Sequence, residues 1–302
     1  MRAPALAPHA LLDRVDEILH LPAECLALYP QIMMLDLCGD GEPEAKWTTD
    51  LNDADEQTLS ITLGTLKLSP KQPGAAAVSA VGTGALIWQA GPALATALMA
   101  SGGGCLREAI HSGAGIELGC GCSALPGVAL ALCGMSKVAV TDSTAVLTEL
   151  RFNLAAYIDD ARASQPSLSL EEVLHPEPLA WDDPTALAGM ASKEGYSIVV
   201  AADCDYADIL QSALLDAVSA ALRPTVESAA LFATAARCQR TLRLFLSRLH
   251  ERGFEVSELS AMLERLPSGA LPAEDSVRFF AARWQSDAQA HQTRERLVAA
   301  CS

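Results

Sequence analysis

The stretch Gly-Ile-Glu-Leu-Gly-Cys-Gly-Cys-Ser, residues 115–123, decides the fold that we expect for this chain. It joins an apolar strand, which carries the acid Glu117, to a Gly-x-Gly turn at residues 119–121. A second apolar run follows from Lys137 and also ends in an acid, Asp142. Glycines let the main chain approach a nucleotide closely, and a carboxylate after the second strand can accept hydrogen bonds from ribose hydroxyls. The pattern is typical of doubly wound α/β folds that bind nucleotides.

The order of these residues favours S-adenosylmethionine over a nicotinamide dinucleotide as the cofactor. Glu117 precedes the glycines, and no complete Gly-x-Gly-x-x-Gly follows. S-adenosylmethionine has an ammonium group, a carboxylate, a sulfonium and a ribose diol, but no pyrophosphate. Glu117 can face its positive end, the turn of Gly119, Cys120 and Gly121 can pack against the amino-acid moiety, and Asp142 can accept both ribose hydroxyls. The alternative is a tight turn in the core of an ordinary α/β protein.

Composition limits the classes of protein that the chain can belong to. With 302 residues, 50% of them hydrophobic and 19% charged, it can bury one large core, or one core and a small appendage. The net charge of -16 argues against a nucleic-acid partner, because tracking a phosphate backbone needs a basic face. It suits a basic partner or simple solubility equally well.

Targeting and metal-binding signals are weak in this sequence. We expect no membrane association and a cytoplasmic location, with the nucleus as an alternative, because Asp13, Asp16 and Glu17 interrupt the N-terminal apolar residues. The nine cysteines form no Cys-x-x-Cys pair, and the six histidines form no His-x-x-x-His pair. We therefore expect reduced, mostly buried thiols and no metal site.

Periodicity along the chain predicts one open sheet with an N-terminal addition. Residues 1–57 are expected to form an extension or cap, and residues 58–68 a β-hairpin or a pair of edge strands. The expected strands are 115–118, 137–141, 172–175, 197–202, 228–234, 253–259 and 276–282, and the expected helices are 85–99, 125–134, 144–157, 207–222 and 237–252. This alternation predicts a seven-stranded, mostly parallel Rossmann-like α/β sheet with helices on both faces. Its last two strands are expected to be antiparallel, because no full helix separates them.

Several elements of the sequence stand in a fixed order and carry a resemblance to a known family. They are Thr83-Gly84-Ala85-Leu86-Ile87-Trp88, the Glu-Leu-Gly-Cys-Gly turn, Val-Thr-Asp142, Leu147 to Asn153, Trp181 and Asp203-Cys-Asp-Tyr206. Together they resemble methyltransferase family 16, which belongs to the seven-β-strand S-adenosylmethionine-dependent enzymes and includes several protein lysine methyltransferases. The resemblance runs from about residue 81 to about residue 260. It implies a methyltransferase domain over residues 58–302 and a protein substrate that presents a basic residue; it says nothing of the oligomeric state.

The resemblance implies a role in cofactor binding for four parts of the chain. Trp88 matches a tryptophan that precedes the cofactor cleft, and its alternative role is a core anchor. Residues 119–121 match the family's small-residue turn, and Asp142 matches its ribose-binding acid. The alternative for Asp142 is a cap for the following helix. Trp181 matches a position beside the adenine, with an exposed loop aromatic as its alternative.

The resemblance also assigns the substrate side of the site. Asp203 and Tyr206 form an Asp-x-x-Tyr motif after the fourth strand, where Asp203 can accept a hydrogen bond from a substrate nitrogen and Tyr206 can wall its channel. Ala202 is expected to lie under the cofactor. The alternative for Asp203 is a cap of the following helix. Asp205 and Asp208 are expected to belong to a solvated acidic rim.

The sequence departs from the family after the glycine turn, where many relatives have a third glycine. Cys122-Ser123-Ala124 stands there instead, so the loop must narrow the cofactor space or follow another path. Three hypotheses therefore stay open. They are a protein lysine methyltransferase, which the Asp-x-x-Tyr motif favours, a methyltransferase for arginine or another nitrogen, and an inactive interaction module with the same fold.

Overall fold

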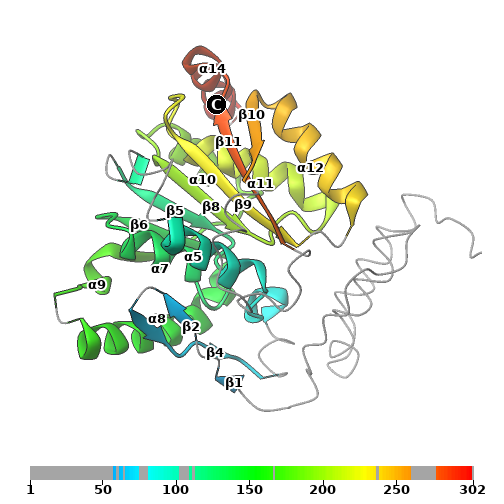
Figure 1. The fold of residues 1–302 in the computed structure, drawn as a ribbon. Coiled ribbons are helices and arrows are strands. Elements are labelled where there is room, and N and C mark those ends of the chain that lie inside the picture. Colours follow the sequence, from blue (N-terminus) through cyan, green and yellow to red (C-terminus); the bar gives the residue numbers. More distant parts are fainter. Residues whose placement is uncertain are drawn as a thin grey trace, which may run out of the picture.

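A computed structural model describes residues 57–58, 61–63, 65–74, 81–101, 109–110, 113–165, 167–235, 238–259 and 277–300. They form a seven-stranded sheet in the order β10-β11-β9-β8-β5-β6-β7, with helices on its two faces (Figure 1). The strands are β5 (Gly115–Leu118), β6 (Val138–Asp142), β7 (Leu174–Pro178), β8 (Ile198–Ala202), β9 (Ala229–Ala235), β10 (Phe254–Glu258) and β11 (Val277–Trp284). The predicted α/β class with seven strands is confirmed.

The sheet is mostly parallel, as predicted. β7, β6, β5, β8 and β9 pair in parallel, whereas β11 is antiparallel to both β9 and β10. The antiparallel last pair is therefore confirmed. β5 and β8 consist almost wholly of buried residues, because helices cover a parallel sheet on both sides.

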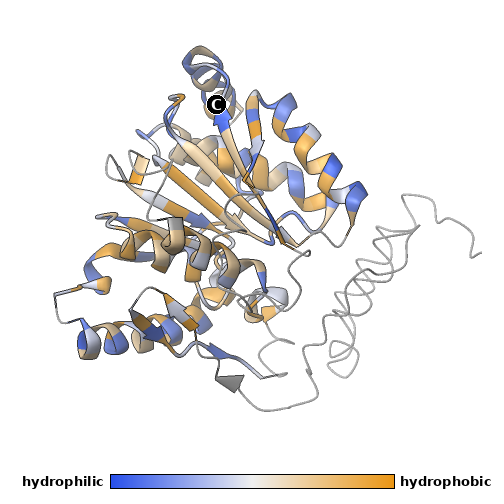
Figure 2. Ribbon diagram, viewed as in Figure 1, coloured by the Kyte–Doolittle hydropathy of each residue, from blue (hydrophilic) through white to orange (hydrophobic). Residues whose placement is uncertain are grey.

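The helices form two layers around the sheet. They are α5 (Ala90–Ser101), α7 (Leu125–Leu132), α8 (Thr144–Ser164), α9 (Leu170–Val173), α10 (Pro184–Ala191), α11 (Asp208–Ala221), α12 (Gln239–Glu251) and α14 (Asp287–Ala299), and a 3-10 turn, η1, spans Thr83–Ala85. In Figure 2 the central strands β8 and β9 are orange or pale orange, whereas α8 and α12 alternate between orange and blue. None of the helices in the described part of the chain combines the length and the apolar character needed to cross a bilayer.

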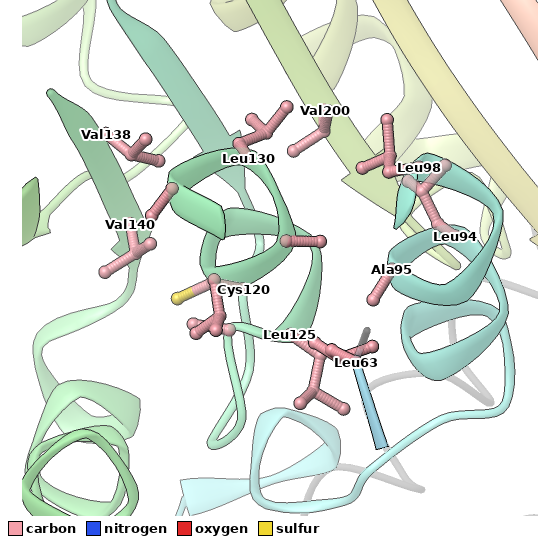
Figure 3. Close-up of a cluster of buried hydrophobic side chains, with 14 of the residues drawn as sticks. Leu63, Leu94, Ala95, Leu98, Cys120, Leu125, Leu130, Val138, Val140 and Val200 are labelled. Carbon is pink, nitrogen blue, oxygen red and sulfur yellow. The ribbon is translucent and has the colours of Figure 1, made fainter. Parts of the chain in front are cut away.

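Two hydrophobic clusters lie on the two faces of the sheet, and alternate residues of the same strands belong to each. Val138, Val140 and Val200 point to one face and pack with Leu94 of α5 and Leu130 of α7 (Figure 3). On the other face, buried residues of β5 and β8 pack with α10, α11 and α12; they include Ile116, Leu118, Val199, Leu187, Leu214 and Phe245. Successive residues of a strand point to opposite faces, so the apolar runs serve both layers.

The structure places several helix boundaries differently from the prediction. The expected helix 85–99 begins at Ala90, because η1 and an extended residue, Leu86, precede it. α10 was missed, because a proline such as Pro184 is common in loops as well as in helices. Pro184 instead occupies the first helical turn, and the Asp183 side chain caps it by accepting hydrogen bonds from two amides. α14 was also missed; the Ser286 hydroxyl caps it by accepting from Gln289 N–H.

The N-terminal strands form a small addition beside α5 and α8. β2 (Ile61–Leu63) pairs antiparallel with β3 (Leu66–Leu68), which confirms the predicted hairpin. β1 (Gln57–Thr58) pairs with β4 (Lys71–Gln72). The leucines of the hairpin are buried in the cluster that contains α5 and α8. Apart from Gln57, the extension predicted for residues 1–57 lies outside the described residues.

Candidate cofactor and substrate site

The candidate site lies where the order of strands changes direction in the sheet. β5 has β6 on one side and β8 on the other, so the connections after β5 and β8 lead to opposite sides. Open α/β sheets bind ligands in the crevice at the carboxyl ends of such strands. β5 ends at Leu118 and β8 ends at Ala202, so the next residues, Gly119 and Asp203, enter this crevice region from its two sides.

The glycine turn needs glycine for both conformation and space. Gly119 has φ 65° and Gly121 has φ 59°, in the left-handed region that favours glycine. A Cβ on Gly119 would lie 2.6 Å from Cys204 Sγ and 2.9 Å from Trp181 Cζ2. One on Gly121 would lie 3.2 Å from the Gly84 carbonyl oxygen. The turn is therefore enclosed by the three segments that carry these residues.

Backbone hydrogen bonds hold the turn in place. Cys120 N–H donates to the Thr141 carbonyl at 3.0 Å, and Cys122 N–H donates to the Gly84 carbonyl at 2.8 Å. The Cys120 side chain is buried in the hydrophobic cluster near Leu125 and Val140, as Figure 3 shows. Cys120 therefore contributes to the crevice through its main chain, and its thiol belongs to the core.

Asp142 links the second strand to the glycine turn. Its Oδ2 accepts a hydrogen bond from Gly121 N–H at 2.9 Å, and its Oδ1 accepts one from Ser143 N–H at 2.7 Å. Burial raises the pKa of this carboxyl group above its usual value. Each carboxylate oxygen can accept a second hydrogen bond, so acceptor capacity is left for ribose hydroxyls. The cap position of α8 belongs to Ser143, not to Asp142.

Glu117 does not lie at the surface of the crevice. The residue is 2% exposed, and its Oε2 accepts a hydrogen bond from Gly127 N–H in α7 at 2.7 Å. Burial is the main cause that raises its pKa well above the usual value. The helix N-terminus favours a nearby negative charge, which partly offsets that effect. Glu117 thus supports the start of α7. It does not have the exposed position that it would need to face the ammonium group of the cofactor.

The two tryptophans approach the turn from different segments. Trp181 follows β7, is half-buried, and has its six-membered ring next to Gly119, so the exposed-aromatic alternative is wrong. Trp88 is also half-buried; its Nε1–H donates to the Thr83 carbonyl at 3.0 Å, and it packs against Ala85 and Leu86. That segment touches the turn through Gly84, so both rings lie on segments that border the crevice.

The Asp203 loop, residues 203–207, brings the Asp-x-x-Tyr motif to the same place. Cys204 Sγ lies 3.4 Å from the Leu118 carbonyl oxygen, just before the glycine turn. Asp203 is 6% exposed with φ 58°, and its N–H donates to the Ala233 carbonyl of β9 at 2.7 Å. Ala202 and Tyr206 are half-buried. The cap position of α11 belongs to Ala207, so Asp203 is not its cap residue.

The residues after the turn, where the sequence departs from the family, include a left-handed residue that is not glycine. Ala124 adopts the left-handed conformation at φ 46° and is the cap residue of α7. Ser123 is 7% exposed. Its side chain therefore adds little to the crevice surface, while Ala124 keeps a conformation that favours glycine.

The sequence did not indicate the buried hydrogen bonds of three polar residues near the site. Asp205, expected in a solvated rim, is 4% exposed and accepts a hydrogen bond from Thr234 Oγ1–H at 3.1 Å, so that expectation is wrong. Asn153 Nδ2 donates to the Cys122 carbonyl at 2.7 Å, and Gln211 Nε2 donates to the Asp205 carbonyl at 2.9 Å. Both amides interrupt buried apolar faces of their helices at helical spacing, which is the signal that could have indicated them.

The described thiols beside the turn are poor nucleophiles. Burial raises the pKa of Cys122 to about 12, and it raises the pKa values of Cys120 and Cys204 as well. A thiol, unlike a thiolate, neither attacks carbon readily nor binds zinc. In the part of the chain that the structure describes, no three acids, histidines or cysteines gather as a metal site.

Comparison with solved structures found methyltransferases at low similarity. An O-methyltransferase family protein from Burkholderia thailandensis has 12% identity and a TM-score of 0.40, covering 65% of this chain and 59% of that chain. An N,N-8-amino-8-demethyl-D-riboflavin dimethyltransferase from Streptomyces davawensis has 15% identity and a TM-score of 0.39, covering 59% and 51%. Human N-acetylserotonin methyltransferase, in complex with S-adenosylmethionine, has 14% identity and a TM-score of 0.38, covering 70% and 55%. The chain thus spans little more than half of each of these proteins, and scores of this size carry no argument about activity. No curated protein matched.

The seven-stranded sheet and the enclosed glycine turn at its centre define a doubly wound α/β protein. The chain belongs to the lysine methyltransferase family, whose model matches residues 76–252, more than half of its length. The family that the sequence resembled is thereby confirmed. The matched segment contains the glycine turn, Asp142, Trp181 and the Asp203 loop.

Proposed function

We propose that this protein transfers a methyl group from S-adenosylmethionine to a lysine side-chain nitrogen of a protein. One observation carries the proposal: the Asp203 loop meets the glycine turn, with Cys204 Sγ 3.4 Å from the Leu118 carbonyl oxygen. A cofactor held at the turn is thus next to the loop that carries the Asp-x-x-Tyr motif. Membership in the lysine methyltransferase family supports the choice of substrate.

The residues around the turn fit this cofactor. Cys204 and Trp181 fill the space that a Cβ on Gly119 would take, so the main chain of the turn lies directly beside the Trp181 ring. Asp142 has acceptor capacity for the ribose diol, Trp181 offers an aromatic face for the adenine, and Trp88 can pack against the methionine end. Ala202 provides a small side chain beneath. When bound, the cofactor supplies a methyl carbon attached to a positively charged sulfur.

Asp203 and Tyr206 would then act on the substrate amine. A lysine nitrogen must reach the methyl carbon as a neutral amine. It would become cationic as the nitrogen–carbon bond forms and the carbon–sulfur bond breaks, with the electron pair left on sulfur as a neutral thioether. The Asp203 carboxylate, 6% exposed, can accept a hydrogen bond from the amine and stabilise this developing charge in a site with little water. Tyr206, half-buried, can form a wall of the lysine channel.

The expected partner is a protein with a basic target residue, and the acidic chain would attract it. We propose a cytoplasmic location, with the nucleus as an alternative, and no nucleic-acid or membrane partner. Transfer to arginine or another nitrogen is the second candidate. An inactive interaction module is the third, and it would need none of the cofactor contacts.

Calorimetry with S-adenosylmethionine, followed by transfer of its labelled methyl group to a protein extract, tests the proposal. We expect saturable cofactor binding and label in protein with the wild-type chain, and loss of most label with Asp203→Ala. Binding without any transfer would favour the interaction module. Absence of binding would contradict the cofactor assignment itself.

A further inference from the structure

We propose that Gln211 is a positioning residue that holds the Asp203 loop in the conformation required for catalysis. The proposal rests on the proposed function, because it gives the loop its role. Gln211 lies in the first turns of α11, directly after the loop, and is fully buried at 0% exposed. A buried side-chain amide is costly unless its groups are hydrogen-bonded, so its contacts indicate what it holds.

The Gln211 amide joins the loop to α12. Its Nε2 donates to the Asp205 carbonyl at 2.9 Å and to the Thr241 carbonyl at 3.1 Å. Its Oε1 accepts from Arg248 Nη1 at 2.9 Å, and the same Nη1 donates to the Asp208 carbonyl at 2.7 Å. Two carbonyls face the nitrogen and one guanidinium faces the oxygen, so this amide orientation is the one that pairs every group.

The loop needs such contacts because Asp203 has an unfavourable backbone conformation. Asp203 has φ 58°, a region that residues other than glycine adopt only where the surroundings enforce it. Asp203 N–H is bound to the Ala233 carbonyl, and the Asp205 side chain to Thr234, both on β9. Cys204 Sγ also contacts the Leu118 carbonyl of β5, and Gln211 adds an attachment that comes from a helix.

Loss of the Gln211 amide would leave the buried Asp205 carbonyl without this donor. The loop could then recover a hydrogen bond by moving toward water, and Asp203 could relax to a negative φ. A carboxylate that moves by about 1 Å orients a nucleophile poorly, which lowers turnover on the order of a hundredfold while leaving distant contacts intact. The glycine turn touches this loop at Cys204, but it is also held by its own hydrogen bonds to Thr141, Gly84 and Asp142, so cofactor binding should change little.

The test compares Gln211→Met with a control on the same helix. Methionine keeps the length and volume but has no amide. Ser219→Ala is the matched control, because Ser219 is 1% exposed and its Oγ–H donates to the Leu215 carbonyl within α11. We expect Gln211→Met to lower kcat at least tenfold with the Kd of S-adenosylmethionine within about twofold of wild type. Ser219→Ala should leave kcat within about twofold, although it loses a buried hydrogen bond.

Hydrogen exchange separates this inference from the proposed function. Backbone amides of residues 203–208 should exchange faster in Gln211→Met than in wild type or Ser219→Ala. Arg248→Met removes the donor to Gln211 Oε1. It should also raise the exchange rates and lower kcat, to a smaller extent than Gln211→Met. This variant replaces Gln211→Met in the test if that protein fails to fold. Unchanged exchange, or equal kcat in Gln211→Met and Ser219→Ala, would overturn the role of Gln211. A wild-type protein that binds the cofactor but methylates nothing would overturn the proposed function instead, whatever the exchange shows.

Discussion

The Asp142 carboxylate accepts a hydrogen bond from the Gly121 amide at 2.9 Å, which joins the end of β6 to the turn after β5. The acid assigned to the ribose therefore also shapes the main chain assigned to the methionine end. Two parts of the cofactor site thus depend on one side chain. Its other oxygen accepts a hydrogen bond from Ser143 N–H, so both carboxylate oxygens are held in place.

Asp142→Ala should weaken binding of S-adenosylmethionine by roughly 2–3 kcal/mol, because charge-assisted hydrogen bonds to the ribose and the tie to Gly121 are lost together. Asp142→Asn is the matched variant. It keeps the shape and a carbonyl oxygen, so its loss should be smaller. Calorimetry on both proteins measures the difference. Wild-type affinity in Asp142→Ala would move the ribose site elsewhere and remove the role of the second strand.

Asp203 variants should affect chemistry rather than binding. Asp203→Ala should lower turnover about a hundredfold or more with cofactor affinity nearly unchanged, since a positioning group acts mainly in the transition state. Asp203→Asn is the sharper variant, because asparagine tolerates the left-handed conformation at φ 58° and removes the charge alone. Tyr206→Phe keeps the aromatic wall and should be milder. Methyl transfer and cofactor binding are measured side by side, and a fully active Asp203→Asn enzyme would end the catalytic assignment.

Glu117→Gln should raise thermal stability at neutral pH. Glutamine can still accept from Gly127 N–H, and it replaces a carboxyl group whose charged form burial disfavours. The raised pKa means that the folded protein holds a proton that the unfolded chain has lost. Wild-type stability is therefore fully present below the ordinary pKa of glutamate and declines as pH rises through the raised value.

The comparison that checks this prediction is the difference in Tm between Glu117→Gln and wild type, measured across that range of pH. The difference should be smallest near pH 4 to 5, around the ordinary pKa of glutamate, and should grow toward pH 8. A variant that is destabilised by the same amount at every pH would show that the carboxylate is favourable where it lies.

The thiols around the turn should resist alkylation in the folded protein. Iodoacetamide reacts with thiolates, and burial raises the pKa of Cys122 to about 12, so few thiolates exist at pH 8. Mass spectrometry should find Cys120, Cys122 and Cys204 unlabelled in native buffer and labelled in denaturant. Rapid native labelling of Cys204 would indicate an exposed or activated thiol and would conflict with the contacts described for the loop.

The central strands could be predicted because buried parallel strands consist of continuous apolar residues. The carboxyl ends of parallel strands lie at the same end of a sheet, so Gly119 and Asp203 could be expected at that end, whereas the neighbouring positions of β5 and β8 were seen only in the structure. α10 could not be distinguished from a loop, because proline signals both a turn and a first helical turn.

The hydrogen-bond partners of buried polar side chains could not be predicted from the sequence. In the sequence, Glu117 and Asp205 cannot be told apart from exposed acids. In the structure, Glu117 accepts a hydrogen bond from Gly127 N–H and Asp205 accepts one from the Thr234 hydroxyl. Such partners are set by packing between segments that are distant along the chain. Gln211 and Asn153 were missed for the same reason, since an amide on a helix is ordinary until its carbonyl partners are known.

The most direct test of lysine methylation is amino-acid analysis of the labelled product. Wild-type protein and Asp203→Asn are incubated with methyl-labelled S-adenosylmethionine and a protein extract, and the labelled protein is hydrolysed to amino acids. We predict that the label elutes with methylated lysine for the wild type and is strongly reduced for Asp203→Asn. Label in methylated arginine, or in a small molecule with none in protein, would contradict the account.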